Sequence, residues 1–204
     1  MSIEDEVLRR LRPTSELREC VDRAVGSILD AVRHAVQERS MDIRVMLVGS
    51  VAKDTYVGSP DLDIFLLFPT TVQRKELERM GLAIGREVLA DGEARYAEHP
   101  YIHGTWEGLE VDLVPCFAIK DTSELQSAVD RTPFHTQYVN SNLKEEQHDQ
   151  VRLLKQFMKG VGTYGAEART QGFSGYLVEL LILRHGGMRE VLEAPQNGRV
   201  MVLL

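Results

Sequence analysis

Residues 43–68, IRVMLVGSVAKDTYVGSPDLDIFLLF, decide the fold of this chain. The apolar runs 43–48 and 61–68 have the length of buried strands, and glycine or proline bounds them. Gly49–Ser50 break the first run, VAKDTYV follows as a short helix, and Gly58–Ser59–Pro60 form a turn. The pattern therefore predicts a strand–helix–strand unit whose polar residues lie where the strands meet their connections.

Outward from this unit, the pattern predicts an α+β (α/β) fold with a small mixed sheet flanked by helices. Val21, Val25 and Ile28 recur at spacings of three and four, which indicates an amphipathic helix with one buried face. Up to residue 117 we expect helices over 2–12, 16–39 and 72–91, and further strands over 93–103 and 109–117.

The pattern changes after about residue 120, where helices replace strands. We expect helices over 121–129, 136–160 and 173–188, with a loop at 160–172. The stretch 194–204 holds APQNG and then a short apolar tail. The sequence therefore predicts two domains, a sheet-bearing domain over 1–130 and a helical domain over 131–204.

Composition restricts the class of protein. The 204 residues are 43% hydrophobic and 27% charged, which is typical of a globular domain and excludes a collagen, a disordered tail or a disulfide scaffold. The net charge of −7 argues against a globally basic nucleic-acid coat protein. Residues 151–189 nevertheless hold six Lys and Arg against two Glu, which suits an anionic ligand bound at one place.

The cysteines and the apolar stretches of the sequence bear on redox state and location. Cys20 and Cys116 lie far apart without a CxxC spacing, so they cannot build a zinc site, and we expect them to be reduced thiols. The N-terminal stretch MSIEDEVLRRLRPTS lacks the apolar core of a signal peptide, and no apolar run is long enough to cross a bilayer. We therefore expect a cytoplasmic protein with no membrane partner.

The candidate chemistry lies in paired acids. Asp61 and Asp63 are two residues apart in a strand, so both side chains point to one face. Adjacent carboxylates on an apolar strand repel each other, and a hard divalent cation such as Mg²⁺ relieves that cost. If strands 61–68 and 109–117 are neighbours, Asp112 completes a site for two ions. The alternative is that Asp61 is a turn residue and Asp63 faces water.

The turn before the acids adds a second signal. Gly49 permits close approach of the backbone to a ligand, and the N-terminus of the following helix offers free N–H groups to a phosphate. Ser50 adds a hydroxyl, and Lys53 lies one turn further on. The alternative for Gly49–Ser50 is a simple helix cap.

These features resemble the DNA polymerase β-like nucleotidyltransferase superfamily. Over residues 14–192 the chain is similar to archaeal-type (class I) CCA-adding enzymes, the tRNA nucleotidyltransferases. The motifs that carry this resemblance are VGSVAKDTYVGSPDLDIFLLFP, YAEHPYIHG, EVDLVPCF, AVDRTPFHTQYV, DQVRLLKQFMK and YGAEARTQGFSGYLVELLI, in that order.

The resemblance implies a catalytic head followed by part of a helical central domain. It implies template-independent addition of C, C and A to the 3′ end of tRNA from CTP and ATP, with release of pyrophosphate. The catalytic and metal-binding residues would be Asp61, Asp63 and Asp112, with two Mg²⁺ ions as cofactors.

The resemblance also implies nucleotide contacts, each with a plainer alternative. Lys53 stands where many relatives carry arginine, so the charge remains but the bidentate fork is lost. His135 could be a surface histidine or a satisfied core histidine, Lys155 a solvated charge and Tyr164 a loop anchor. His99 and His103 match no ligand pattern and receive no role. The implied nucleotide-binding residues are Gly49, Ser50, Lys53, Thr132, His135, Lys155 and Tyr164.

Members of that family are considerably longer than this chain, so we expect much of their tRNA-binding surface to be missing here. Two other functions stay open: a minimal nucleotidyltransferase with a different acceptor, and a non-catalytic NTP- or RNA-binding module. A homodimer is also left open.

Overall fold

The computed structural model describes residues 2–39, 41–97, 99–165 and 172–194. The predicted apolar tail and residues 166–171 of the predicted loop lie outside these ranges. The chain forms two compact units, each with its own hydrophobic core. The sheet unit comprises Thr14–Lys53 and Ser59–Gln137, and the helical unit comprises Met1–Pro13, Asp54–Gly58 and Tyr138–Leu204. The division into domains 1–130 and 131–204 stays a prediction.

The sheet unit is built on a mixed sheet, as the sequence predicts. Within the described residues it has five strands in the order β1-β2-β5-β4-β3. The β2–β5 pair is parallel, and the other neighbouring pairs are antiparallel. The strands are β1 (Arg44–Val48), β2 (Leu62–Phe68), β3 (Glu93–Tyr96), β4 (Pro100–Trp106) and β5 (Leu109–Phe117).

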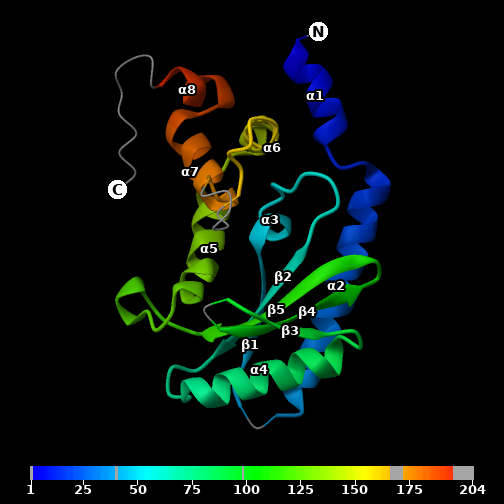
Figure 1. The fold of residues 1–204 in the computed structure, drawn as a ribbon, viewed down its shortest axis with the longest axis vertical. Helices are drawn as coiled ribbons and strands as arrows, with labels where there is room; N and C mark the ends of the chain where they lie inside the picture. The colour runs from blue at the N-terminus through cyan, green and yellow to red at the C-terminus, as the bar shows by residue number, and fades with distance from the viewer. Residues whose placement is uncertain (1, 40, 98, 166–171, 195–204) are drawn as a thin grey trace. The chain divides into compact units, whose positions relative to one another are not determined.

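The two faces of this sheet differ in chemistry because side chains alternate along a strand. Ile64 and Leu66 of β2 face α2 (Ser15–Gln37) and α4 (Arg74–Val88), and this face holds the main core. Figure 1 shows α4 lying across that face of the sheet. The opposite face carries Asp63 between apolar neighbours, so the alternation of β2 places an acid outside the helix-covered core.

A tight turn connects β4 to β5 and corrects the predicted strand boundaries. Glu107 and Gly108 both have positive φ, +48° and +84°, as a two-residue type I′ turn requires. The predicted strand 93–103 is two strands, and the second continues to Trp106, beyond the predicted boundary. The glycines of the connecting stretch suggested a longer loop, but extended backbone accommodates Gly104 well inside a strand.

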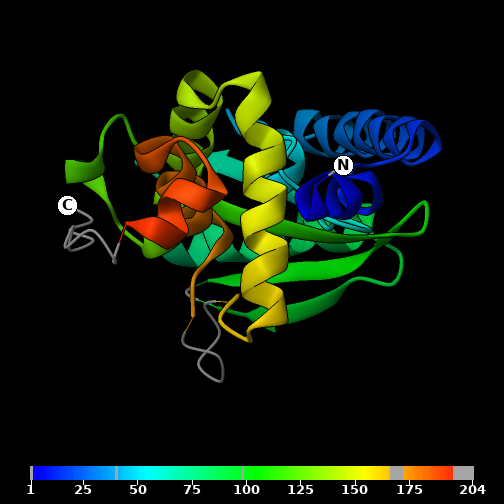
Figure 2. The same cartoon turned by 90° about the horizontal axis from the view of Figure 1, so that it is seen from above.

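The helical unit contains α1 (Ile3–Leu11), α6 (Glu145–Gly160), α7 (Gly175–His185) and α8 (Met188–Glu193). Figure 2 shows α6 and α7 side by side, and Leu154 and Ile182 are among the apolar residues in their shared core. The predicted helix 136–160 is two helices, because α5 (Thr132–Asn142) ends before Lys144 begins a new N-terminus.

Two further observations complete the description. The predicted helix 121–129 is replaced by two short 3₁₀ helices, Thr122–Glu124 and Ala128–Arg131, separated by a break. Of the helices in the described ranges, none combines the length and the apolar character needed to span a bilayer.

Candidate active site

The turn after β1 brings backbone against a carboxylate. Gly49 begins the short helix α3 (Gly49–Ala52) with φ of +73°, a conformation that glycine adopts readily. A Cβ at this position would lie 1.9 Å from Oδ2 of Asp63, far inside van der Waals contact. Glycine is therefore required here both by the backbone conformation and by the close approach of Asp63.

The predicted neighbours Asp63 and Asp112 lie side by side in the sheet. They are register partners of the parallel strands β2 and β5, whose backbones are about 4.8 Å apart in such a sheet. Both belong to the face opposite the main core. Asp61 precedes β2 and is exposed to solvent. The predicted acid site requires strands 61–68 and 109–117 to be neighbours. In the structure the corresponding strands, β2 and β5, are paired.

Like charges dominate the surroundings of Asp63. Burial raises the pKa of its carboxyl to about 7, and the neighbouring charges of Asp112 and Asp61 act in the same direction. Lys53, which is only 7% exposed, lowers the pKa of Asp63 but does not cancel the rise. The charge of Lys53 therefore favours the ionised form of the Asp63 carboxyl.

The donor set fits a divalent cation such as Mg²⁺. Carboxylate oxygens are its preferred protein ligands, and a cation would relieve the repulsion that raises the pKa of Asp63. Among the described residues, however, no three His, Cys, Asp or Glu side chains already form a metal-holding group. Convergence of Asp61, Asp63 and Asp112 on two ions therefore stays a prediction.

A cavity of about 310 Å³ lies beside the acids. Its lining includes Gly49, Asp63, Asp112 and Thr132, so four of the predicted site residues share one hollow. His99 also lines it, with its side chain buried and neither ring nitrogen hydrogen-bonded to any described residue. The volume lies at the lower end of the range for small-molecule sites.

Other predicted site residues of the sheet unit do not line this cavity. Ser50 is half-buried in α3, directly after the glycine of the turn. His135 is half-buried on α5, three residues beyond Thr132, so the two lie on one face of the helix. Their contacts to a nucleotide stay predictions.

Lys155 and Tyr164 belong to the helical unit. The Lys155 side chain is 4% exposed, and its ammonium donates to the backbone oxygen of Thr55 at 2.9 Å and lies 3.5 Å from Glu179 Oε1. The Tyr164 ring packs on the helical core, with Lys159 Nζ 5.3 Å from the ring centre. The structure shows an internal partner for Lys155 that the sequence did not indicate, and the nucleotide contacts of both residues stay predictions.

Arg152 is a second buried cation of α6. Its guanidinium donates to the carboxylate of Asp54 at 2.6 Å and to that of Asp149 at 3.2 Å, while its side chain is 2% exposed. Part of the basic character of residues 151–189 is therefore compensated inside the helical unit. Net charge along a sequence does not reveal such pairing.

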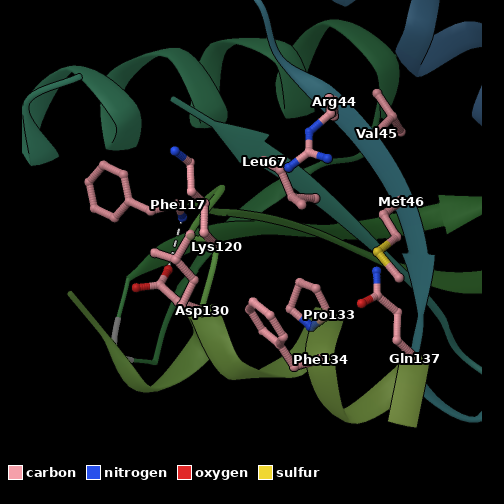
Figure 3. A pocket seen from close by; sticks show the side chains of 11 residues that line it. Arg44, Val45, Met46, Leu67, Phe117, Lys120, Asp130, Pro133, Phe134 and Gln137 are labelled. Atoms are coloured by element: carbon pink, nitrogen blue, oxygen red, sulfur yellow. Dashed lines mark hydrogen bonds between the residues drawn. The ribbon is translucent and has the colours of Figure 1, made fainter. Parts of the chain in front are cut away.

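A second cavity, of about 370 Å³, lies in the sheet unit near the start of β1 (Figure 3). Arg44 and Lys120 line it together with the aromatic ring of Phe134. Its acid, Asp130, is fully buried and accepts hydrogen bonds from the backbone N–H groups of Phe117 and Ser127 at 2.9 and 2.8 Å. Because its carboxylate accepts these backbone N–H groups, we assign Asp130 a structural role.

His103 is a residue at the site that the sequence analysis missed. Its Nδ1 lies 2.7 Å from Oδ1 of Asp112, and the two residues are register partners of β4 and β5. The signal was present in the turn, because a two-residue connection at Glu107–Gly108 pairs Trp106 with Leu109 and hence His103 with Asp112.

Comparisons with known proteins agree with this architecture. A nucleotidyltransferase domain model matches residues 29–135, and a model of the second domain of tRNA nucleotidyltransferases matches residues 149–203. The chain is 46% identical over 190 residues to the CCA-adding enzyme of Haloarcula marismortui, covering 93% of this chain and 41% of the relative. It is 46% identical over 198 residues to that of Methanothermobacter thermautotrophicus, covering 95% and 44%. The chain spans less than half the length of the curated relatives it matches.

Solved structures with low sequence identity share the fold. A Cid1 poly(U) polymerase bound to MgATP superimposes with a TM-score of 0.63 at 18% identity, over 88% of this chain and 53% of that one. A cytoplasmic RNA terminal U-transferase gives a TM-score of 0.61 at 19% identity, over 89% and 50%. The predicted polymerase β-like fold is confirmed.

Proposed function

The chain belongs to the nucleotidyltransferase domain family, and from this membership we propose that it adds C, C and A to the 3′ end of tRNA from CTP and ATP. The observation that carries the proposal is the pairing of Asp63 with Asp112 across β2 and β5, beside the Gly49 turn. The similarity to archaeal CCA-adding enzymes supports tRNA as the acceptor.

Asp61, Asp63 and Asp112 would hold two Mg²⁺ ions. When bound, these ions supply activation of the attacking 3′-hydroxyl and neutralisation of the triphosphate. The repulsion that raises the pKa of Asp63 in the protein supports this assignment, because a cation would convert an unfavourable cluster into a ligand set.

The chain's own residues bind and orient the nucleotide. The backbone of the Gly49 turn and the Ser50 hydroxyl would contact the triphosphate, and Lys53 would offset part of its charge. Thr132 lines the cavity beside the acids, which supports a nucleotide contact there. The further contacts would come from His135, Lys155 and Tyr164. A cytoplasmic location and a homodimer stay predictions.

The test is incubation of the protein with tRNA that lacks its 3′ CCA, together with CTP, ATP and Mg²⁺, followed by sequencing of the RNA ends. We expect CCA ends and release of pyrophosphate. Asp63→Ala should lower the rate at least a hundredfold, because it removes an acid from the metal site. Asp30→Ala, which removes an exposed carboxylate of α2, should leave the rate unchanged.

The competing functions give different results. Pyrophosphate release with another RNA or hydroxyl compound, but not with tRNA, would indicate a nucleotidyltransferase with a different acceptor. Metal-independent NTP binding without pyrophosphate release would indicate a non-catalytic binding module. Equal rates for the unsubstituted protein and for Asp63→Ala would contradict the metal site.

A further inference from the structure

We propose that His103 is a positioning residue for the third carboxylate, Asp112, and thereby strengthens metal binding at the site. The inference rests on the proposed function, because it assumes that Asp112 is a metal ligand. It concerns a histidine that is not among the residues assigned to nucleotide or metal binding above.

The contact between the two side chains is short and fixed by the backbone. His103 Nδ1 lies 2.7 Å from Asp112 Oδ1, and the antiparallel register of β4 and β5 places their Cα atoms opposite each other. The type I′ turn at Glu107–Gly108 sets that register. A one-residue slip would turn the histidine to the other face of the sheet.

The proposed metal site fixes the direction of this hydrogen bond. A carboxylate that ligates a metal ion only accepts hydrogen bonds, so the proposal requires the His103 imidazole to donate through Nδ1–H. The His103 side chain is 16% exposed and the Asp112 side chain is 29% exposed, so most of the surface of both side chains is covered by the protein. His103 thus occupies one acceptor position of Oδ1, and the other acceptor positions of the carboxylate, those of Oδ2 included, are left for a metal ion.

The histidine extends the row of acids across the sheet. Register partners place Asp63 of β2, Asp112 of β5 and His103 of β4 in one line on the same face. His103 thus lies on the opposite side of Asp112 from Asp63. A donor there restricts rotation of the Asp112 carboxylate, and partners of this kind typically change metal affinity by about 10- to 100-fold.

A purely structural role makes a different prediction. A cross-strand pair that only stabilises the sheet would affect unfolding, and its removal would leave metal affinity unchanged. The two roles are separated by measuring Mn²⁺ binding, as a spectroscopic substitute for Mg²⁺, by electron paramagnetic resonance of free Mn²⁺ and by calorimetry. Neither measurement depends on turnover.

The decisive variants are His103→Ala, which removes the donor, and His103→Asn, whose side-chain amide replaces Nδ1–H. We expect His103→Ala to weaken Mn²⁺ binding about tenfold and His103→Asn to restore most of it. His34→Ala removes an exposed imidazole of α2 as a matched control and should bind Mn²⁺ like the unsubstituted protein.

A double-mutant cycle tests whether His103 acts through Asp112, and it requires His103→Ala in a protein that also carries Asp112→Ala. If His103 acts through Asp112, His103→Ala has no further effect on Mn²⁺ affinity there. Tenfold weakening in that background as well, or unchanged affinity in His103→Ala alone, would overturn the positioning role and leave the metal site intact. Failure of the unsubstituted protein to bind Mn²⁺ would instead overturn the proposed function together with this inference.

An independent measurement uses the imidazole itself. Long-range ¹H–¹⁵N spectra distinguish the two neutral tautomers of histidine, and we expect His103 to carry its proton on Nδ1. In Asp112→Ala the tautomer preference should relax. A proton found on Nε2 alone in the unsubstituted protein would contradict the hydrogen bond on which the proposal depends.

Discussion

Charged residues are compensated in opposite ways in the two units. In the helical unit, Lys155 and Glu179 are buried, lie 3.5 Å apart and share Thr55 as a hydrogen-bond partner. In the sheet unit, the carboxylates of Asp63 and Asp112 are like-charged neighbours, and the pKa of Asp63 is raised to about 7. Charge that the protein neutralises internally supports the fold, whereas charge that it leaves repelling indicates a place for a ligand.

The largest effect should follow from breaking the internally neutralised network. Glu179→Ala leaves the Lys155 ammonium buried without its carboxylate, which typically costs about 3–5 kcal/mol of unfolding free energy. Chemical denaturation followed by circular dichroism measures this loss. The double variant Lys155→Met with Glu179→Leu should recover most of it, since apolar replacements of a buried pair are often tolerated. A loss below about 1 kcal/mol in Glu179→Ala would show that the pair is dispensable.

The turn at the site should be nearly as sensitive. Gly49→Ala adds a Cβ 1.9 Å from Asp63 Oδ2 to a residue with φ of +73°. Gly162→Ala has the same φ of +73° but nothing within 4 Å of its Cβ, so it isolates the backbone strain of about 1–2 kcal/mol. We expect Gly49→Ala to lose more stability than this control and to lose Mn²⁺ binding. Equal behaviour of the two variants would contradict the close approach of Asp63.

Asparagine at two different acids should have opposite effects. Burial raises the pKa of Asp63 above its unfolded value of 3.8 to about 7, so in metal-free buffer stability falls as pH rises between these values. Asp63→Asn should therefore gain about 1–2 kcal/mol at pH 8 without metal and lose the stabilisation by Mg²⁺, as thermal melts would show.

Asp130 is the matched control for this substitution. Its carboxylate accepts backbone N–H groups of Phe117 and Ser127, so Asp130→Asn should lose about 1–3 kcal/mol at the same pH. If Asp63→Asn and Asp130→Asn lost the same stability, the prediction that like-charge repulsion destabilises the ionised Asp63 would be wrong.

The smallest effect should come from an exposed ion pair. Arg79 and Glu76 lie 2.6 Å apart on the surface of α4, where solvent and salt screen their attraction. Arg79→Ala should leave the thermal midpoint unchanged and should not respond to added salt differently from the unsubstituted protein. A clear drop in the midpoint would mean that short distance alone, rather than burial, makes an ion pair stabilising in this protein.

The fold was predictable where local patterns are strong. The apolar character of 61–68 and 109–117 identified two strands, and the spacing of Val21, Val25 and Ile28 identified α2. The break between α5 and α6 was missed because neither glycine nor proline marks it in the sequence around Leu143. The β4–β5 turn was missed because Glu107, at φ of +48°, is not a residue typical of that position.

The site was predictable in its parts. Gly49 and the acids at 61, 63 and 112 carry their signal in residue type and spacing, and the paired strands bring Asp63 and Asp112 together. The buried partner of Lys155 was not predictable, because Thr55 lies 100 positions away in the sequence. The pairing of His103 with Asp112 was missed for a different reason, because it follows from the register that the unrecognised two-residue turn at Glu107–Gly108 sets.

Residue type and period define the strands, the helix-covered face and the acids of this protein, because they depend on neighbours within a few positions. Which strands adjoin, and which charges are sealed inside or left to repel, follows from sheet order and packing. Those contacts join residues tens of positions apart, and burial, rather than composition, decides whether a charge there needs a partner from outside the chain.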